Sequence, residues 1–200
     1  MSAKDNWCDP GHWAVFAFAT TSFMLGFVNS NFIGSSAVEV VLPVAFIFGG
    51  LVQLTVAVLE VARGNTFGAC VFGTYGPFWI IYGLYVTFYA SKVNSASAGT
   101  AVALFLAMFA VMTFFFVIAS LRTDWVLVAV FVLIDVALGL LAYGAGMANS
   151  TATHAGGYVT LAFAVIAWYH ALAGLVAGTY GKPLLPVGYI GPLGLETERA

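Results

Sequence analysis

Apolar residues follow one another almost without interruption from Trp13 to Tyr180, and short polar segments divide them into six stretches. All but the first have the roughly 20 residues that an α-helix needs to cross the hydrocarbon of a bilayer. None shows the alternation of a transmembrane β-strand. The pattern therefore predicts an all-α bundle of six membrane-spanning helices, at Trp13–Val28, Ala37–Val61, Phe67–Tyr89, Thr100–Ser120, Trp125–Met147 and Tyr158–Tyr180.

The composition also indicates a membrane protein. Charged residues make up 7% of the chain and hydrophobic residues 62%, whereas a soluble domain has about 25% charged residues. The net charge is only −2 and no basic cluster is present, which argues against a nucleic-acid surface. We therefore expect a protein that acts across or within a bilayer.

Short connections between the six stretches favour antiparallel neighbours in one bundle. We expect a transmembrane domain over residues 13–180, a cytoplasmic N-terminal segment over 1–12 and a cytoplasmic tail over 181–200. Glycines are frequent in the stretches, and Gly174 and Gly178 are spaced as a GxxxG pair. Such small residues let helices approach closely, both within one bundle and between copies of the chain.

The positions of the basic residues predict the orientation in the membrane. Alternating topology puts five of them on one side and only Lys92 on the other, and basic residues mark the cytoplasmic side. Both termini are therefore expected in the cytoplasm, in a multi-pass protein of the plasma (inner) membrane. The five residues are Lys4, Arg63, Arg122, Lys182 and Arg199.

Polar residues inside the stretches are candidates for function, because a polar group in hydrocarbon is costly unless it is paired or solvated. The first stretch needs its polar flanks to reach spanning length, so we expect it to be partly unwound or lined with polar groups. It carries Thr20, Thr21, Ser22 and Asn29. These side chains either line a polar pathway or bond to carbonyls of their own helix. Gln53, in the second stretch, either clamps two helices or lines a cavity.

Tyr75 lies beside a glycine and Pro77, where its phenol either donates to an anionic substrate or packs in the bundle with its hydroxyl already bonded. Asp135 is the most unusual residue, since it falls near the middle of the fifth stretch. It is expected to make a structural hydrogen bond across a helix or subunit contact, or to take part in a proton path. Glu60 precedes Arg63 and is expected to pair with it at the interface.

Sequence signatures of catalysis are not present. The chain has no GxSxG, no HExxH and no glycine-rich phosphate loop. Its histidines, at positions 12, 154 and 170, lack the i, i+4 spacing of metal ligands, and there are only two cysteines. We therefore expect no enzyme, no metal site and no cofactor.

Several motifs in the second and third stretches carry a family resemblance. Residues 49–53 read GGLVQ, Glu60 follows, residues 64–68 read GNTFG and residues 75–79 read YGPFW. This spacing resembles the acetate/succinate transporter family, also called the GPR/FUN/YaaH or AceTr family. The resemblance extends over nearly the whole chain and includes Phe18, Thr21, Asn29, His154 and residues 185–188.

The N-terminal signature of that family departs from this chain. It reads approximately NPAPLGL, whereas residues 9–15 here read DPGHWAV, so that only the proline is kept. His12 introduces a group that titrates near neutral pH. The departure predicts a divergent subgroup with an altered substrate or pH response.

The resemblance implies a homohexamer with one pathway in each protomer. It also implies transport of small monocarboxylates such as acetate, with succinate as a further substrate, by a proton-coupled symporter or an anion channel. A constriction of Phe, Tyr and Leu narrows the pathway in the family. Phe18 and Tyr75 match the first two positions, and the third falls on Ile134, with Leu133 one residue before it.

The residues and the resemblance together define one candidate site. We expect Asp135 and His12 to be candidates for proton coupling. Two other functions stay open: passage of another small solute such as ammonia, or a non-transporting membrane sensor on the same scaffold. The expected substrate pathway consists of Phe18, Thr21, Ser22, Asn29, Gln53, Tyr75, Trp79, Leu133 and Ile134.

Overall fold

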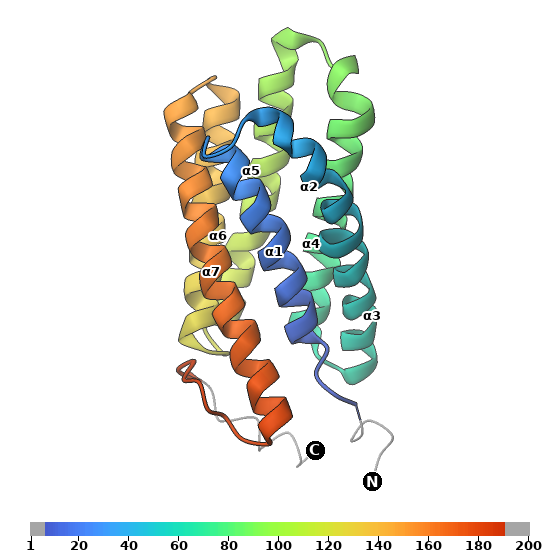
Figure 1. The fold of residues 1–200 in the computed structure, drawn as a ribbon, viewed down its shortest axis with the longest axis vertical. Helices are drawn as coiled ribbons and strands as arrows, with labels where there is room; N and C mark the ends of the chain where they lie inside the picture. The colour runs from blue at the N-terminus through green and yellow to red at the C-terminus, as the bar shows by residue number, and fades with distance from the viewer. Residues whose placement is uncertain (1–6, 191–200) are drawn as a thin grey trace.

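A computed structural model describes residues 7–190, and these residues form long helices that lie side by side (Figure 1). No strand forms in this range; a single isolated bridge joins Asp124 to Tyr189. The all-α prediction is confirmed. The elements are α1 (Gly11–Asn29), η2 (Ser35–Ala37), α2 (Val38–Val44), η3 (Ala45–Val52), α3 (Gln53–Arg63), α4 (Thr66–Leu84), η4 (Tyr85–Tyr89), η5 (Ala90–Lys92), α5 (Ser95–Ser120), α6 (Trp125–Gly146) and α7 (Ser150–Tyr180).

Within residues 7–190, six helical spans are long and apolar enough to cross a membrane, as the sequence predicts. The second span comprises η2, α2, η3 and α3, and the third comprises α4, η4 and η5. The last span begins at Ser150 rather than at the predicted Tyr158, because the Asn149 side chain accepts a hydrogen bond from the Ala152 amide and caps the helix. Hydropathy marks the part of a helix that lies in hydrocarbon and misses polar first turns.

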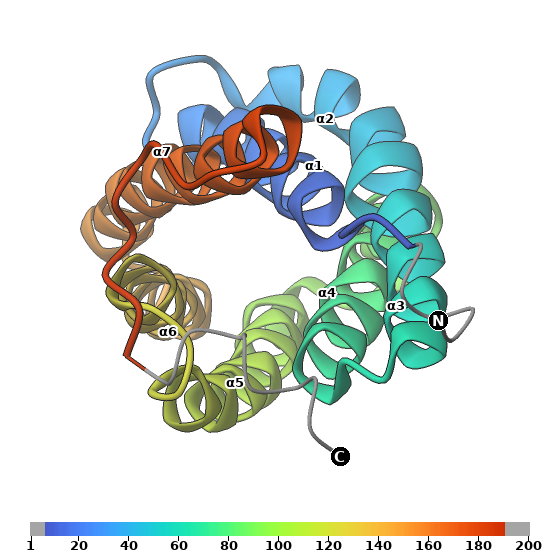
Figure 2. The ribbon, with the colours of Figure 1, turned by 90° about the horizontal axis from the view of Figure 1, so that it is seen from below.

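The helices form a ring when seen along the bundle (Figure 2). Helix α1 packs against α7, α7 against α6, and α6 against α5, while α3 packs against α4. Helices α4 and α5 make the loosest of these neighbouring contacts. Aromatic and aliphatic side chains from α1, α4, α6 and α7 fill much of the middle of the ring.

The irregular backbone lies in the second span and not in the first, so of the two alternatives expected for the first span, unwinding or a polar lining, unwinding is wrong. Helix α1 is regular throughout, whereas η3 is wound as a π-helix. Gly49 and Gly50 lie in this segment, and a Cβ on Gly49 would come 2.8 Å from Trp79 Cγ. The glycines therefore allow η3 to pack closely against its neighbours, which hydropathy alone does not predict.

Both ends of the described chain lie at the same end of the bundle (Figure 1). Arg63, Arg122 and Lys182 belong to this end, and Lys92 lies between α4 and α5 at the other. Two further basic residues in the orientation argument, Lys4 and Arg199, lie outside the described residues. In the following, "lower" means the end that holds the chain ends, and "upper" means the opposite end.

Candidate functional site: two cavities that meet at three side chains

Two cavities lie one above the other inside the ring of helices. The upper cavity has a volume of about 360 Å³ and is lined by residues that include Ser22, Asn29 and Trp79. The lower cavity has a volume of about 140 Å³ and is lined by residues that include His12 and Gln53. Each is large enough to hold several water molecules or a small organic ion.

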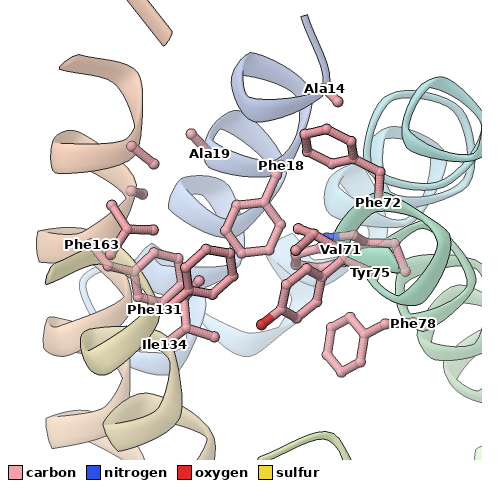
Figure 3. Packing of buried hydrophobic residues seen from close by; sticks show 14 of the residues in the cluster. Ala14, Phe18, Ala19, Val71, Phe72, Tyr75, Phe78, Phe131, Ile134 and Phe163 are labelled. Atoms are coloured by element: carbon pink, nitrogen blue, oxygen red, sulfur yellow. The ribbon is translucent and has the colours of Figure 1, made fainter. Parts of the chain in front are cut away.

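Three residues line both cavities: Phe18 from α1, Tyr75 from α4 and Ile134 from α6. We call these three residues the waist. Their side chains point toward one another from three helices (Figure 3). The rings of Phe18 and Tyr75 have centroids 5.0 Å apart, and all three side chains are buried. The waist therefore separates the cavities with a closely packed apolar contact.

The Tyr75 hydroxyl is held by a second polar group. It lies 2.7 Å from Thr113 Oγ1, and Thr113 Oγ1 donates to the Phe109 carbonyl at 2.8 Å. Because a threonine hydroxyl has one proton, Tyr75 is the donor to Thr113. The bond fixes the position of the Tyr75 ring and leaves the lone pairs of its oxygen, but not its proton, for other partners.

The wall of the upper cavity is mostly aromatic and aliphatic. Among the described residues, no charged side chain lines it. Its neutral polar groups include the Ser22 hydroxyl, the Asn29 amide and the indole of Trp79. The Trp79 Nε1–H is buried and lacks a hydrogen-bond partner within residues 7–190. A buried donor of this kind is costly unless a ligand or water accepts its proton.

Charged groups gather at the lower cavity. Arg63 Nη1 lies 3.0 Å from Asp9 Oδ1 and 3.1 Å from Glu60 Oε2, and Asp9 and Glu60 both line this cavity. The predicted Glu60–Arg63 ion pair is thus present, with the Glu60 side chain fully buried. Gln53 donates to the Gly49 carbonyl at 2.6 Å and keeps a buried Oε1 without a partner in the described range.

Two histidines complete the lower cavity. The rings of His12 and His170 have centroids 6.2 Å apart. His170 Nε2 lies 3.1 Å from Asp124 Oδ2, and Asp124 Oδ1 accepts from the Leu127 amide at 2.8 Å. His170 and Asp124 are not among the residues predicted from the sequence, because 46 residues separate them along the chain. The sequence signal that could have identified Asp124 is its position as the N-terminal cap of α6.

The other predicted pathway residues have different positions. Ser22, Asn29 and Trp79 line the upper cavity, and His12 and Gln53 line the lower one. Thr21 is fully buried, donates to the Ala17 carbonyl at 2.8 Å and lines neither. Leu133 and Asp135 are partly buried on α6 and also line neither.

Comparison with known proteins gives a consistent result. The model of the GPR1/FUN34/yaaH family matches residues 2–185. Acetate permease A of Emericella nidulans is 32% identical over 90% of this chain and 66% of its own length, so this chain spans slightly less than two thirds of that relative. The Succinate-acetate/proton symporter SatP of Escherichia coli K12 is 26% identical over 90% of this chain and 95% of its own length.

A solved structure, described as the structure of the bacterial acetate channel SatP, has the same fold. It matches with a TM-score of 0.85 and 26% sequence identity, and it covers 92% of this chain and 100% of its own.

Proposed function

Because the chain belongs to the GPR1/FUN34/yaaH family, we propose that it carries small monocarboxylates across the membrane. Acetate is the main proposed substrate and succinate a further one, which the names of the permease and of the symporter support. The observation that carries the proposal is the set of three side chains shared by both cavities. A solute that passes from one cavity to the other must pass Phe18, Tyr75 and Ile134.

The chemistry of the upper cavity suits a small carboxylate. Ser22, Asn29 and Trp79 offer neutral donors for the charged end, and aromatic walls suit the methyl group. A fixed cation there would hold the anion strongly, whereas conduction needs binding that is weak enough to release. In this proposal Thr21 and Leu133 support the wall, and Gln53 receives the substrate below the waist.

The mode of transport is either proton-coupled symport or passive conduction. The names of the two relatives labelled SatP describe a symporter in one case and a channel in the other. His12 and Asp135 were the two candidates for carrying a proton. His12 lines the lower cavity and Asp135 lines neither, so we assign the coupling role to His12.

We also propose that the protein assembles as a homohexamer with one pathway in each protomer. In an 18-residue apolar stretch of α5, only 6% of the residues are buried, compared with 33–44% in the corresponding stretches of the other spans. Asp135 is partly exposed on the neighbouring α6, where an ionisable group in contact with lipid alone is costly. A second copy of the chain packed against this side would cover both the exposed face of α5 and Asp135.

The distribution of basic residues supports a location in the plasma (inner) membrane with the lower end in the cytoplasm. Arg63, Arg122 and Lys182 belong to the lower end and Lys92 to the upper end, as expected where positive residues mark the cytoplasmic side. The charged lower cavity then faces the cytoplasm and the apolar upper cavity faces outward.

Uptake of labelled acetate into proteoliposomes tests the function. The imposed proton gradient and the membrane voltage are varied separately, and protein-free liposomes give the background. Accumulation driven by the proton gradient shows symport, and flux that follows only the acetate gradient and voltage shows a channel. Flux of methylammonium without acetate flux favours an ammonia pathway, and binding without any flux favours a sensor. Either of these last results contradicts the proposal.

A further inference from the structure

The two histidines of the lower cavity are fixed by their surroundings. The His12 ring lies directly against Gly174 of α7, and a Cβ on that glycine would overlap the ring. The same test at Gly178, one turn further along α7, finds no heavy atom of residues 7–190 within 4 Å. Gly174 therefore provides the space that the His12 imidazole occupies. The two glycines of the GxxxG pair have different surroundings and do not form a single packing face within one copy of the chain.

His170 has one ring nitrogen engaged and the other available. Its Nε2 faces the Asp124 carboxylate. An ionised carboxylate has no proton to donate, so it can act only as a hydrogen-bond acceptor. The neutral ring therefore carries its hydrogen on Nε2. Its Nδ1 is buried and lacks a partner within residues 7–190, so an incoming proton adds to this nitrogen and turns the imidazole into an imidazolium.

We propose that His12 and His170 together form the proton-binding site of the transporter and that their protonation admits the carboxylate into the lower cavity. This inference rests on the proposed transport of carboxylates and names the groups that couple it to protons. Both imidazoles line the same cavity, below the waist. Imidazole is the side chain whose charge ordinarily changes between pH 5 and 8.

The charges around the two rings explain the coupling. Asp9 comes from the segment before α1, Glu60 and Arg63 from α3, and Asp124 from the start of α6. Among residues 7–190, these contacts thus bring three carboxylates but only one guanidinium to the lower cavity and its histidines. With both imidazoles neutral, this negative surplus repels a carboxylate. Protonated imidazoles offset it, so proton binding and carboxylate binding each favour the other.

The same side chains do not form a metal centre. Within the described residues, no three His, Cys, Asp or Glu side chains are grouped closely enough to hold a metal ion. The pair is also distinct from Asp135, which lines neither cavity. A proton site that exchanges with solvent needs access from one end, and Asp9, which lines the same cavity as His12, is exposed.

Equilibrium exchange of fluoroacetate across proteoliposomes, with the same pH on both sides, tests the pair. The carboxyl group of this probe stays ionised throughout the range, so its own protonation does not contribute. For the wild-type chain we expect exchange to be at least about tenfold faster at about pH 5.5 than at about pH 7.5, because imidazole side chains ordinarily change charge within this range. The His12→Gln/His170→Gln double variant is expected to lose this ratio.

His154→Gln is the matched control, because His154 lies on α7 but lines neither cavity. It should keep both the rate and the ratio. Asp124→Asn is a second variant that keeps both imidazoles. Because it removes the carboxylate that faces the His170 ring, it should slow exchange at about pH 5.5 relative to the wild type.

Two results overturn the inference: a double variant whose exchange keeps the wild-type ratio, or an Asp124→Asn profile that coincides with the wild type. Failure of the proposed function gives a different result, since the wild-type chain would then exchange neither fluoroacetate nor acetate at any pH.

Discussion

The two cavities lie on one axis but differ in size and chemistry. The upper cavity has a volume of about 360 Å³ and is walled by aromatic and aliphatic side chains with a few neutral donors. The lower cavity has a volume of about 140 Å³ and is lined by two histidines and by Asp9 and Glu60, which are both paired with Arg63. On our proposal, the upper cavity selects the substrate by shape and weak hydrogen bonds, and the lower cavity admits the substrate when the two histidines are protonated.

The difference shows how one narrow path can separate two tasks. A neutral, aromatic chamber holds a carboxylate weakly and so permits fast release. A chamber of titratable groups responds to pH but would bind an anion strongly if it were permanently cationic. The waist between them keeps the two environments apart, because its three side chains are closely packed and buried.

Filling the waist should have the largest effect. Ile134→Phe adds volume where both cavities end, so we expect acetate flux to fall by about tenfold or more, a barrier increase of ~1.4 kcal/mol. Val132→Phe is the control, because Val132 is exposed on α6 and lines neither cavity, so this variant should keep flux near the wild-type rate. Acetate uptake into proteoliposomes measures both. Equal flux in the two variants would contradict a waist at Ile134.

Emptying the waist should change selectivity rather than abolish transport. Phe18→Ala removes a buried ring between the cavities, and we expect flux of succinate to rise several-fold relative to acetate because the opening widens. The deletion should also cost about 3–5 kcal/mol of stability. Phe163→Ala removes an equally buried ring that lines only the upper cavity and controls for this cost. An unchanged succinate-to-acetate ratio in Phe18→Ala would remove Phe18 from the gate.

Displacing His12 should affect only the response to pH. Gly174→Ala displaces the His12 imidazole from its contact with α7. We expect the ratio of the fluoroacetate exchange rate at low pH to that at neutral pH to fall by about threefold, because part of the tenfold pH response is lost. Gly178→Ala introduces the same methyl group into open space and should leave the ratio unchanged. Equal ratios in the two variants would show that the position of His12 has no part in the pH response.

Changing Asp135 should have the smallest effect on transport. Asp135→Asn keeps the shape of a side chain that lines neither cavity. Because the substitution alters no group of the pathway, the pH profile of acetate uptake is expected to match that of the wild type within about twofold. Light scattering of the purified protein then reports its oligomeric state. A changed pH profile with an intact oligomer would instead place Asp135 in the proton path.

Much of the fold could be predicted from the sequence, because a bilayer demands about 20 apolar residues for each spanning helix. All six spans are present in the described residues. The starts of α5 and α7 were missed, since Asn94 and Asn149 cap these helices in polar segments, whereas their last residues, Ser120 and Tyr180, agree with the prediction. The π-helical winding of η3 was missed as well, because it follows from packing around Gly49 and Gly50.

The candidate site was less accessible to prediction. The motif resemblance selected Phe18, Tyr75 and Ile134, and these residues lie together between the cavities. Thr21 and Ser22 could not be separated by sequence, yet one hydroxyl bonds to its own helix and the other lines the upper cavity. The contact of His170 with Asp124 joins distant parts of the chain, and no local pattern encodes it.

Accessibility of single cysteines tests the central claim, that one path is closed at the waist between two separate cavities. In a chain whose native Cys8 and Cys70 are replaced, Asn29→Cys reports on the upper cavity and Val15→Cys on the lower one. A charged, membrane-impermeant thiol reagent is added to sealed vesicles of either orientation. We predict that each cysteine reacts from one side only, from opposite sides of the membrane, and that acetate slows both reactions. Reaction of both cysteines from the same side would contradict the account.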